Sequence, residues 1–291
     1  MKLYHLLIPL LTATGAINAE NNLPVSKGLM LDLDADHGVE LEEGNRVKAW
    51  HNQVKGNAAD VFVKRDEGRK VPGSGRPTLV QKVKKIGDHN TLAFDRQELI
   101  NMDEDAFDNL LTGSGYTWVS VMSIVQQKKG KKDVNSFFGN LKNGSNYEGF
   151  WGCIDDANHV WMGSRCWPVG KKGRQPFWNE KNPKVFAPKP LVLDRYYLVI
   201  GRMGAGQGKV NLDLFINSAT AIDTKKVPVN PKANSSKMAI GQERDATNHP
   251  GHESFVGEIT RFLIFDRPLS NQELSELSKF LIKRYKIASN E

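Results

Sequence analysis

The chain has 291 residues, of which 39% are hydrophobic and 25% charged, a composition of folded globular proteins that excludes disordered and fibrous classes. Its formal net charge of +7 favours an anionic partner, such as an acidic polysaccharide, nucleic acid or an anionic membrane; solvated Lys-rich loops are the simpler explanation. All-β sandwiches often run to ~200–250 residues in one unit, so a single large domain is expected.

The first predicted element is an export signal over residues 1–19. Lys2 precedes the apolar run Leu6–Leu11, which is shorter than the ~20 apolar residues that a membrane span needs. We therefore expect cleavage near Ala19 and an exported, single-domain protein over residues 20–291, without a membrane span. Export argues against a nucleic-acid partner. A buried N-terminal strand is the alternative for the apolar run.

Short β-rich runs separated by Gly, Pro, Asn and Asp clusters follow, a pattern typical of sandwiches and barrels. The expected strands are Leu29–Leu33, Thr117–Val125, Tyr196–Gly201, Val210–Ile216 and Ile259–Phe265. The Gly-rich turn between the third and fourth predicts a hairpin. The Pro- and Lys-rich stretch over residues 170–190 is interpreted as an irregular loop.

The last predicted element is a helix over residues 271–285. Ser270 and Glu273 form the capping-box pattern that starts a helix. After them, Leu274, Leu277, Leu281 and Tyr285 recur at helical spacing, so one apolar face is expected.

Three pairs of segments follow one another in a recognisable order: Leu31–Val39 with Asn45–Trp50, Arg76–Leu79 with Leu92–Asp95, and Phe255–Ile259 with Phe265–Ser270. Together they resemble the bacterial laminin-G-like branch of the concanavalin A-like lectin/glucanase superfamily, with Arg96 standing where the family often has Gly. The resemblance implies an all-β, two-sheet antiparallel jelly-roll sandwich with a C-terminal α-helix. That fold hosts lectins, adhesion modules, hydrolases and lyases, so it implies no single activity.

Metal and cofactor sites are not defined by the sequence. Asp32, Asp34 and Asp36 are spaced like the start of an EF-hand calcium loop, but Gly38 falls one position too late. Related folds often bind calcium, so the resemblance leaves calcium as an open expectation with its ligands unknown. The sequence indicates no other cofactor.

Two weak catalytic patterns are present. Glu243 and Asp245 are the nearest match to the carboxylates that hydrolases of this fold carry on one strand face, but the last carboxylate is missing and a turn is the better interpretation. A lyase would need a base and a group that neutralises a uronate, for which Tyr147, His159 and Arg165 are candidates by type.

Aromatic residues are densest between residues 151 and 178. Trp and Tyr combine a flat apolar face with a polar edge, which suits stacking on sugar rings. We expect a ligand-binding surface made of Trp161, Trp167, Trp178, His159, Arg165, Lys171 and Arg174. Core packing is the alternative for Trp151 and Trp161, whereas Trp167 and Trp178 are expected to be exposed.

The two cysteines of the chain, Cys153 and Cys166, flank part of this segment. In an exported protein they are expected to form a disulfide that closes a short loop, and two reduced thiols are the alternative.

These observations favour an exported, lectin-like protein that binds an anionic polysaccharide without turning it over. A polysaccharide hydrolase or lyase on the same fold is one alternative, and a cell-surface adhesion or structural module is another. The glycan and the oligomeric state are left open.

Overall fold

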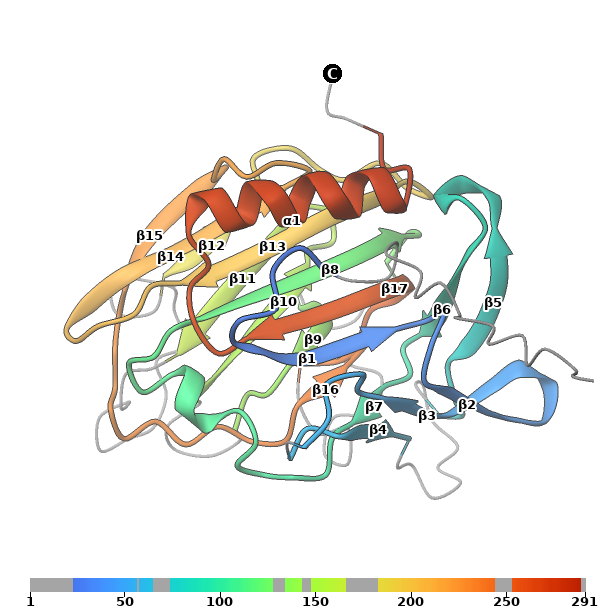
Figure 1. The fold of residues 1–291 in the computed structure, drawn as a ribbon, viewed down its shortest axis with the longest axis horizontal. Helices are drawn as coiled ribbons and strands as arrows, with labels where there is room; N and C mark the ends of the chain where they lie inside the picture. Colours follow the sequence, from blue (N-terminus) through green and yellow to red (C-terminus); the bar gives the residue numbers. More distant parts are fainter. Residues whose placement is uncertain are drawn as a thin grey trace, which may run out of the picture.

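Two stacked layers of antiparallel strands, with one α-helix on an outer face, make up the part of the protein that the structure describes (Figure 1). The structure is a computed structural model that describes residues 23–56, 58–64, 74–127, 134–142, 148–165, 183–243 and 253–288. The expected export signal therefore lies outside the described residues.

The layers are connected by hydrogen bonding around one corner. The first layer runs in the order β15 (Asp223–Pro228), β14 (Lys209–Ile216), β13 (Tyr196–Met203), β8 (Tyr116–Ile124), β17 (Val256–Phe265) and β1 (Leu29–Asp34). The second runs β12 (Lys184–Phe186), β11 (Val160–Arg165), β10 (Gly149–Ile154), β9 (Asn135–Gly139), β16 (Ala239–Ile240), β7 (Leu99–Ile100), β4 (Val61–Val63), β3 (Arg46–His51) and β2 (Val39–Glu42). At the corner, β6 (His89–Asp95) pairs with the first half of β17 and with β5 (Thr78–Val83).

All five expected strands are confirmed, with ends that differ by at most three residues from the prediction. The predicted hairpin is formed by β13 and β14, where Val199 lies opposite Ile216 and Met203 opposite Leu212. The sandwich fold is thus present, as the alternation of short β-rich runs and turns indicates.

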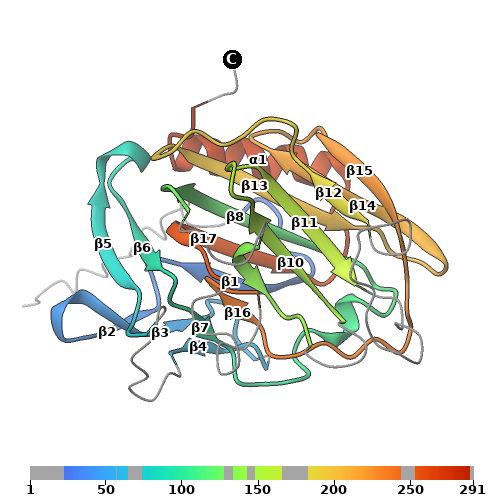
Figure 2. The same cartoon turned by 180° about the vertical axis from the view of Figure 1, so that it is seen from behind.

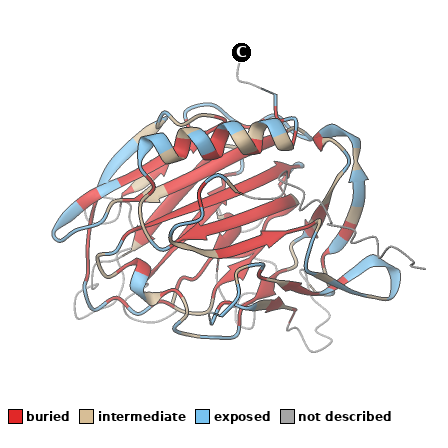
Figure 3. Cartoon of the chain, viewed as in Figure 1, coloured by how far each residue is buried: buried red, intermediate tan, exposed pale blue. Residues whose placement is uncertain are grey.

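The alternation of side chains along β8 divides the apolar residues between two cores. Trp118 and Met122 face the second layer and join the main core, whereas Val119 and Val121 face the helix. Every residue of β8 is buried because the helix covers one face and the second layer covers the other (Figure 3).

The helix α1 (Asn271–Arg284) begins as predicted. The Ser270 hydroxyl accepts from the Glu273 N–H while the Glu273 carboxylate accepts from the Ser270 N–H, which completes the capping box. Leu274, Leu277 and Leu281 are fully buried against the first layer.

No strand or helix was predicted for the aromatic segment, and most of its described part is strand. Residues 149–154 and 160–165 are the strands β10 and β11, and the stretch expected to be irregular contains the short strand β12. The reason is burial on both faces: Phe150 and Ile154 point into the main core, while Trp151 and Cys153 form a smaller apolar cluster on the other side. Strands buried on both sides lack the polar–apolar alternation that identifies a strand in a sequence.

The acidic residues of β1 are paired with arginine. The Arg261 guanidinium donates to both carboxylate oxygens of Asp32 at 2.9 and 2.8 Å and lies 3.6 Å from Asp34. Desolvation opposes the charge on Arg261, but these carboxylates outweigh it and raise the pKa of Arg261. Asp32 and Asp34 therefore join β1 to β17, and among the described residues no group of three or more acidic, His or Cys side chains could hold a metal ion.

Candidate functional site

The strands β11 and β12 lie on the side of the sandwich away from α1 (Figure 2), and four partly exposed residues lie on or next to them. We call this set the β11–β12 strip: His159, Arg165, Lys184 and Phe186. The register places Phe186 opposite Trp161 and Lys184 opposite Gly163, and His159 and Arg165 flank these positions along β11. Because side chains two residues apart on a strand share a face, all four project to the same side.

The strip rests on a buried tryptophan. Trp161 is 1% exposed and packs edge-to-face against Trp151, with ring centroids 6.3 Å apart. The Lys184 Nζ lies 4.4 Å from the centre of the Trp161 ring and 5.3 Å from that of Phe186. Trp161 therefore has a packing role, and the expectation that it stacks on a ligand does not fit its burial; its ring holds Lys184 in place instead.

His159 is oriented by a neighbouring carboxylate. Asp155 accepts a hydrogen bond from the His159 backbone N–H at 2.8 Å, and its Oδ2 lies 3.1 Å from the imidazole Nδ1. On the other side, the His159 ring lies 4.9 Å from the Phe186 ring, tilted by 38°. Donation from Nδ1 to Asp155 leaves Nε2 as the acceptor of the neutral imidazole.

Acidic residues border the same face. Glu243 and Glu253 are both buried and are joined through the backbone, the Glu243 N–H donating to the Glu253 carbonyl at 3.3 Å. Burial and then the Glu243 charge raise the pKa of the Cys153 thiol well above its usual value, while the Ser136 hydroxyl lies 2.9 Å from the sulfur. The outer face thus carries a basic and aromatic strip beside a buried acidic pair.

Several expected site residues lie outside the described residues. They are Tyr147, Cys166, Trp167, Lys171, Arg174, Trp178 and Asp245. The segment with most of them joins the strip at both ends, because it connects β11 to β12.

The described residues constrain the expected disulfide. Cys153 is a buried free thiol. Arg165, the residue before Cys166, pairs with Gly149, which is four residues from Cys153 along β10. Four strand residues span about 13 Å, a disulfide needs Cα atoms within ~7 Å, and one peptide step covers about 3.8 Å. A Cys153–Cys166 bond would therefore require the end of β11 to separate from β10.

Lys184 and Phe186 are the site residues that sequence reasoning missed. They alternate with the buried Val185 in a three-residue strand, inside a stretch whose prolines and lysines indicate a loop. The only signal was this alternation, which is too short to distinguish from chance.

The chain is similar to several solved structures at low sequence identity. The chain superposes on a Trypanosoma rangeli sialidase complexed with 2,3-difluorosialic acid with a TM-score of 0.50 and 13% identity, covering 90% of this chain and 34% of the sialidase. A heptameric SAP-like pentraxin from Limulus polyphemus gives 0.41 and 14%, covering 61% and 73% of the two chains. A Ruminococcus gnavus IT-sialidase CBM40 bound to α2,3-sialyllactose gives 0.40 and 17%, covering 56% and 80%.

The likeness to the sialidase concerns the fold alone, and this chain spans about a third of the sialidase. No protein-family model and no curated protein matches the sequence. Within the described part of the chain, no helix has the length and apolar character needed to cross a membrane.

Proposed function

We propose that this protein is an exported, laminin-G-like carbohydrate-binding protein that recognises an anionic polysaccharide through the β11–β12 strip. The observation that carries the proposal is the strip itself, which places two cations and two flat rings side by side and partly exposed on one sheet face. Export through a signal peptide that is cleaved near Ala19 is part of what we propose.

The side chains of the strip suit the binding of an acidic sugar. Phe186 and His159 offer ring surface for the C–H face of a sugar, and Lys184 and Arg165 offer donors for a carboxylate or sulfate. Arg165 has a planar fork that matches two oxygens, whereas Lys184 acts as a point charge. Because the strip runs along a sheet face, it suits a long chain better than a small molecule.

The segment between β11 and β12 is proposed to extend the surface. Trp167, Trp178, Lys171 and Arg174 follow Arg165 in sequence and precede Lys184, so they are tethered to both cations of the strip. They would add stacking rings and positive charge to the same site.

A glycan array that includes alginate, heparin, polygalacturonate and a neutral dextran tests the proposal. We expect binding to at least one anionic glycan, weakened about ten- to a hundredfold by Arg165→Gln or Lys184→Gln, since a hydrogen bond to a charged group is worth ~1.5–3 kcal/mol. Phe186→Ala, Trp167→Ala and Trp178→Ala should also weaken it. The matched control is Lys279→Gln, an exposed lysine on α1 at the opposite face.

If the wild-type protein and the strip variants bound the anionic glycan equally well, the glycan-binding site would lie outside the strip. Failure to bind any glycan, together with capture of a defined protein partner, would favour the adhesion role.

A lyase is the second candidate, favoured by the His159–Asp155 pair. With Nδ1 held by Asp155, the His159 Nε2 could accept the proton next to a uronate carboxylate, whose charge Arg165 or Lys184 would neutralise. β-Elimination then breaks the glycosidic bond and leaves a double bond on the uronate, while the oxygen of the leaving sugar takes up a proton from the His159 imidazolium or from water. Release of an unsaturated product from alginate or polygalacturonate, abolished by His159→Gln, would establish this activity; binding without such a product would exclude it for those glycans.

A further inference from the structure

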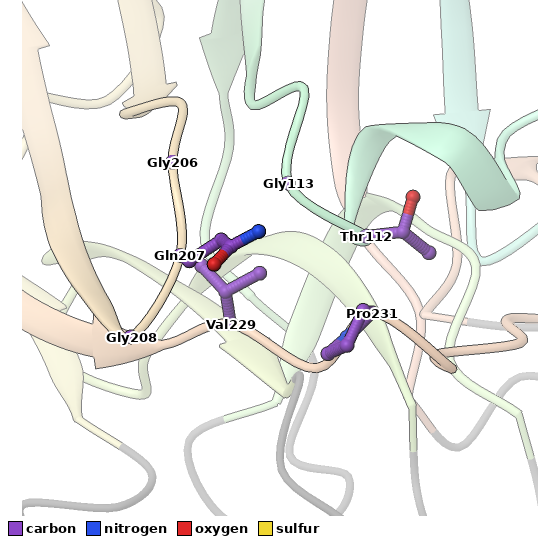
Figure 4. Close-up of a pocket in the computed structure, with 7 residues that line it drawn as sticks. All are labelled: Thr112, Gly113, Gly206, Gln207, Gly208, Val229 and Pro231. Atoms are coloured by element: carbon purple, nitrogen blue, oxygen red, sulfur yellow. The ribbon is translucent and has the colours of Figure 1, made fainter.

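A pocket at one end of the sandwich has a chemistry different from that of the strip. Its volume is about 590 Å³, and it lies between the loop before β8, the β13–β14 turn and the segment after β15 (Figure 4). Seven residues line it: Thr112, Gly113, Gly206, Gln207, Gly208, Val229 and Pro231. None of them carries a charge, although the chain as a whole has a net charge of +7.

The three loops are fastened to one another. The Gly206 N–H donates to the Gly113 carbonyl at 2.9 Å, and the Val229 N–H donates to the Gly208 carbonyl at 2.7 Å. Gly113 has a φ of 130°, and a Cβ there would lie 3.1 Å from the Gly206 carbonyl oxygen, so glycine permits this close approach. The pocket is therefore held in shape by backbone hydrogen bonds before any ligand arrives.

The outer wall of the pocket is anchored by a buried carboxylate. Glu148 accepts from the Asn230 side-chain amide at 3.0 Å and from the Asn234 N–H at 2.8 Å. Both partners belong to the segment that carries Val229 and Pro231. A wall fixed in this way reduces the entropy that binding would otherwise lose to ordering the loop.

The polar groups of the pocket match hydroxyl groups. The Gln207 side chain extends from its turn toward the side of the pocket that carries Thr112 (Figure 4), and it makes no hydrogen bond to other described residues. Its amide offers two donors and an acceptor. The Thr112 hydroxyl donates to the Asn109 carbonyl at 3.1 Å, which leaves its lone pairs to accept. Val229 and Pro231 supply apolar surface between them.

We infer that this pocket binds an uncharged, hydroxyl-bearing ring, in practice a neutral sugar residue. Ligand hydroxyls would exchange hydrogen bonds with Gln207 and Thr112, and the C–H face of the ring would pack on Val229 and Pro231. The absence of charge in the lining disfavours an acidic sugar here, because its carboxylate would lose hydration without gaining an ionic partner. This inference does not depend on the strip.

The test is an NMR titration of the ¹⁵N-labelled protein with glucose, galactose, mannose, fucose, N-acetylglucosamine and glucuronate, one at a time. We expect at least one neutral sugar to shift the amide signals of Gly113, Gly206 and Gly208 in a saturable way, and glucuronate to shift them less. Gln207→Leu should weaken that binding about five- to tenfold, because one neutral hydrogen bond is worth ~1 kcal/mol. Thr112→Val should weaken it in the same direction.

The control is Gln81→Leu, at an exposed position on β5. Unchanged signals elsewhere in the spectrum would show that the variants are folded. The inference is overturned if no neutral sugar shifts the pocket amides, if Gln207→Leu leaves the affinity unchanged, or if glucuronate binds as well as the neutral sugars. Because Gln207 is not part of the strip, loss of neutral-sugar binding with retained polysaccharide binding separates the two sites.

Discussion

Glu273, at the start of α1, is held by the residues that begin the helix. Arg267 donates two hydrogen bonds to its carboxylate, at 3.0 and 2.7 Å, and the Ser270 N–H donates a third at 2.9 Å. The bonds from Arg267, followed by the one from the Ser270 backbone, lower the pKa of Glu273 from 4.5 to about 2.

The lowered pKa predicts an acid-sensitive contribution to stability. A carboxyl whose pKa is lower in the folded state stabilises the fold fully above its ordinary pKa of 4.5, and this contribution disappears as the pH falls toward about 2. A carboxyl NMR titration should find Glu273 near 2, and Arg267→Gln should return it toward 4.5. Glu276→Gln, on the same helix, is the control and should leave Glu273 unchanged. A wild-type pKa near 4.5 would contradict the assigned pairing.

The Cys153 thiol should not react with alkylating reagents in the folded protein. Its thiol is fully buried, and burial followed by the Glu243 charge raises its pKa, so little thiolate is present at neutral pH. Alkylation with iodoacetamide followed by peptide mapping should leave Cys153 unmodified in the native protein and modify it after denaturation. Recovery of Cys153 in a disulfide-linked peptide before denaturation would instead support the bond expected from the sequence.

At the scale of the element, glycines set how closely β13 packs on its neighbour β8. Gly201 lies opposite Trp118, and a Cβ at this position would lie 2.2 Å from the indole ring. Gly204 follows the last residue of β13, and a Cβ there would have its nearest neighbour at 3.5 Å, with an ordinary backbone φ. The two positions are close in the chain but differ in the space around them.

This difference predicts unequal costs for the same substitution. Gly201→Ala should lower the free energy of unfolding by about 1–3 kcal/mol, because the Trp118 ring must move within a packed core. Gly204→Ala should change it by less than ~0.5 kcal/mol, since the added methyl has room and alanine restricts the unfolded chain. Urea unfolding followed by Trp fluorescence measures both. Equal effects of the two substitutions would mean that the Gly201 contact is not tight.

The elements also show how far a single sequence can be interpreted. β8 was predictable because it is long and carries the β-branched Val119 and Val121, the β13–β14 hairpin because a Gly-rich turn separates its strands, and α1 because of its capping box. β10 was not, because Trp151 and Cys153 on one face are as apolar as Phe150 and Ile154 on the other. The candidate site was only partly predictable for a similar reason. His159 and Arg165 could be chosen from the sequence because of their chemistry, but Lys184 lies beside them only because β12 pairs with β11.

At the scale of the whole molecule, the two proposed sites lie in different electrostatic settings. The net charge of +7 attracts an anionic polymer over distances set by the Debye length, ~10 Å at 0.1 M salt and ~3 Å at 1 M. The strip adds local cations to this field. The pocket beside Gln207 has an uncharged lining and gains nothing from it.

Salt should therefore separate the two binding activities in one protein. Raising the salt concentration from 0.1 to 1 M (~10 to ~3 Å of screening length) should weaken binding of the anionic polysaccharide strongly, and it should leave neutral-sugar binding nearly unchanged. The double variant Arg165→Gln with Lys184→Gln should bind the polysaccharide weakly at low salt and lose less as salt rises, because fewer charges remain to be screened. Calorimetry at several salt concentrations measures each affinity. If the affinity for the polysaccharide did not change with salt, recognition through charge would be contradicted. If the affinity for the neutral sugar did change with salt, charged groups outside the pocket lining would have to take part in binding it.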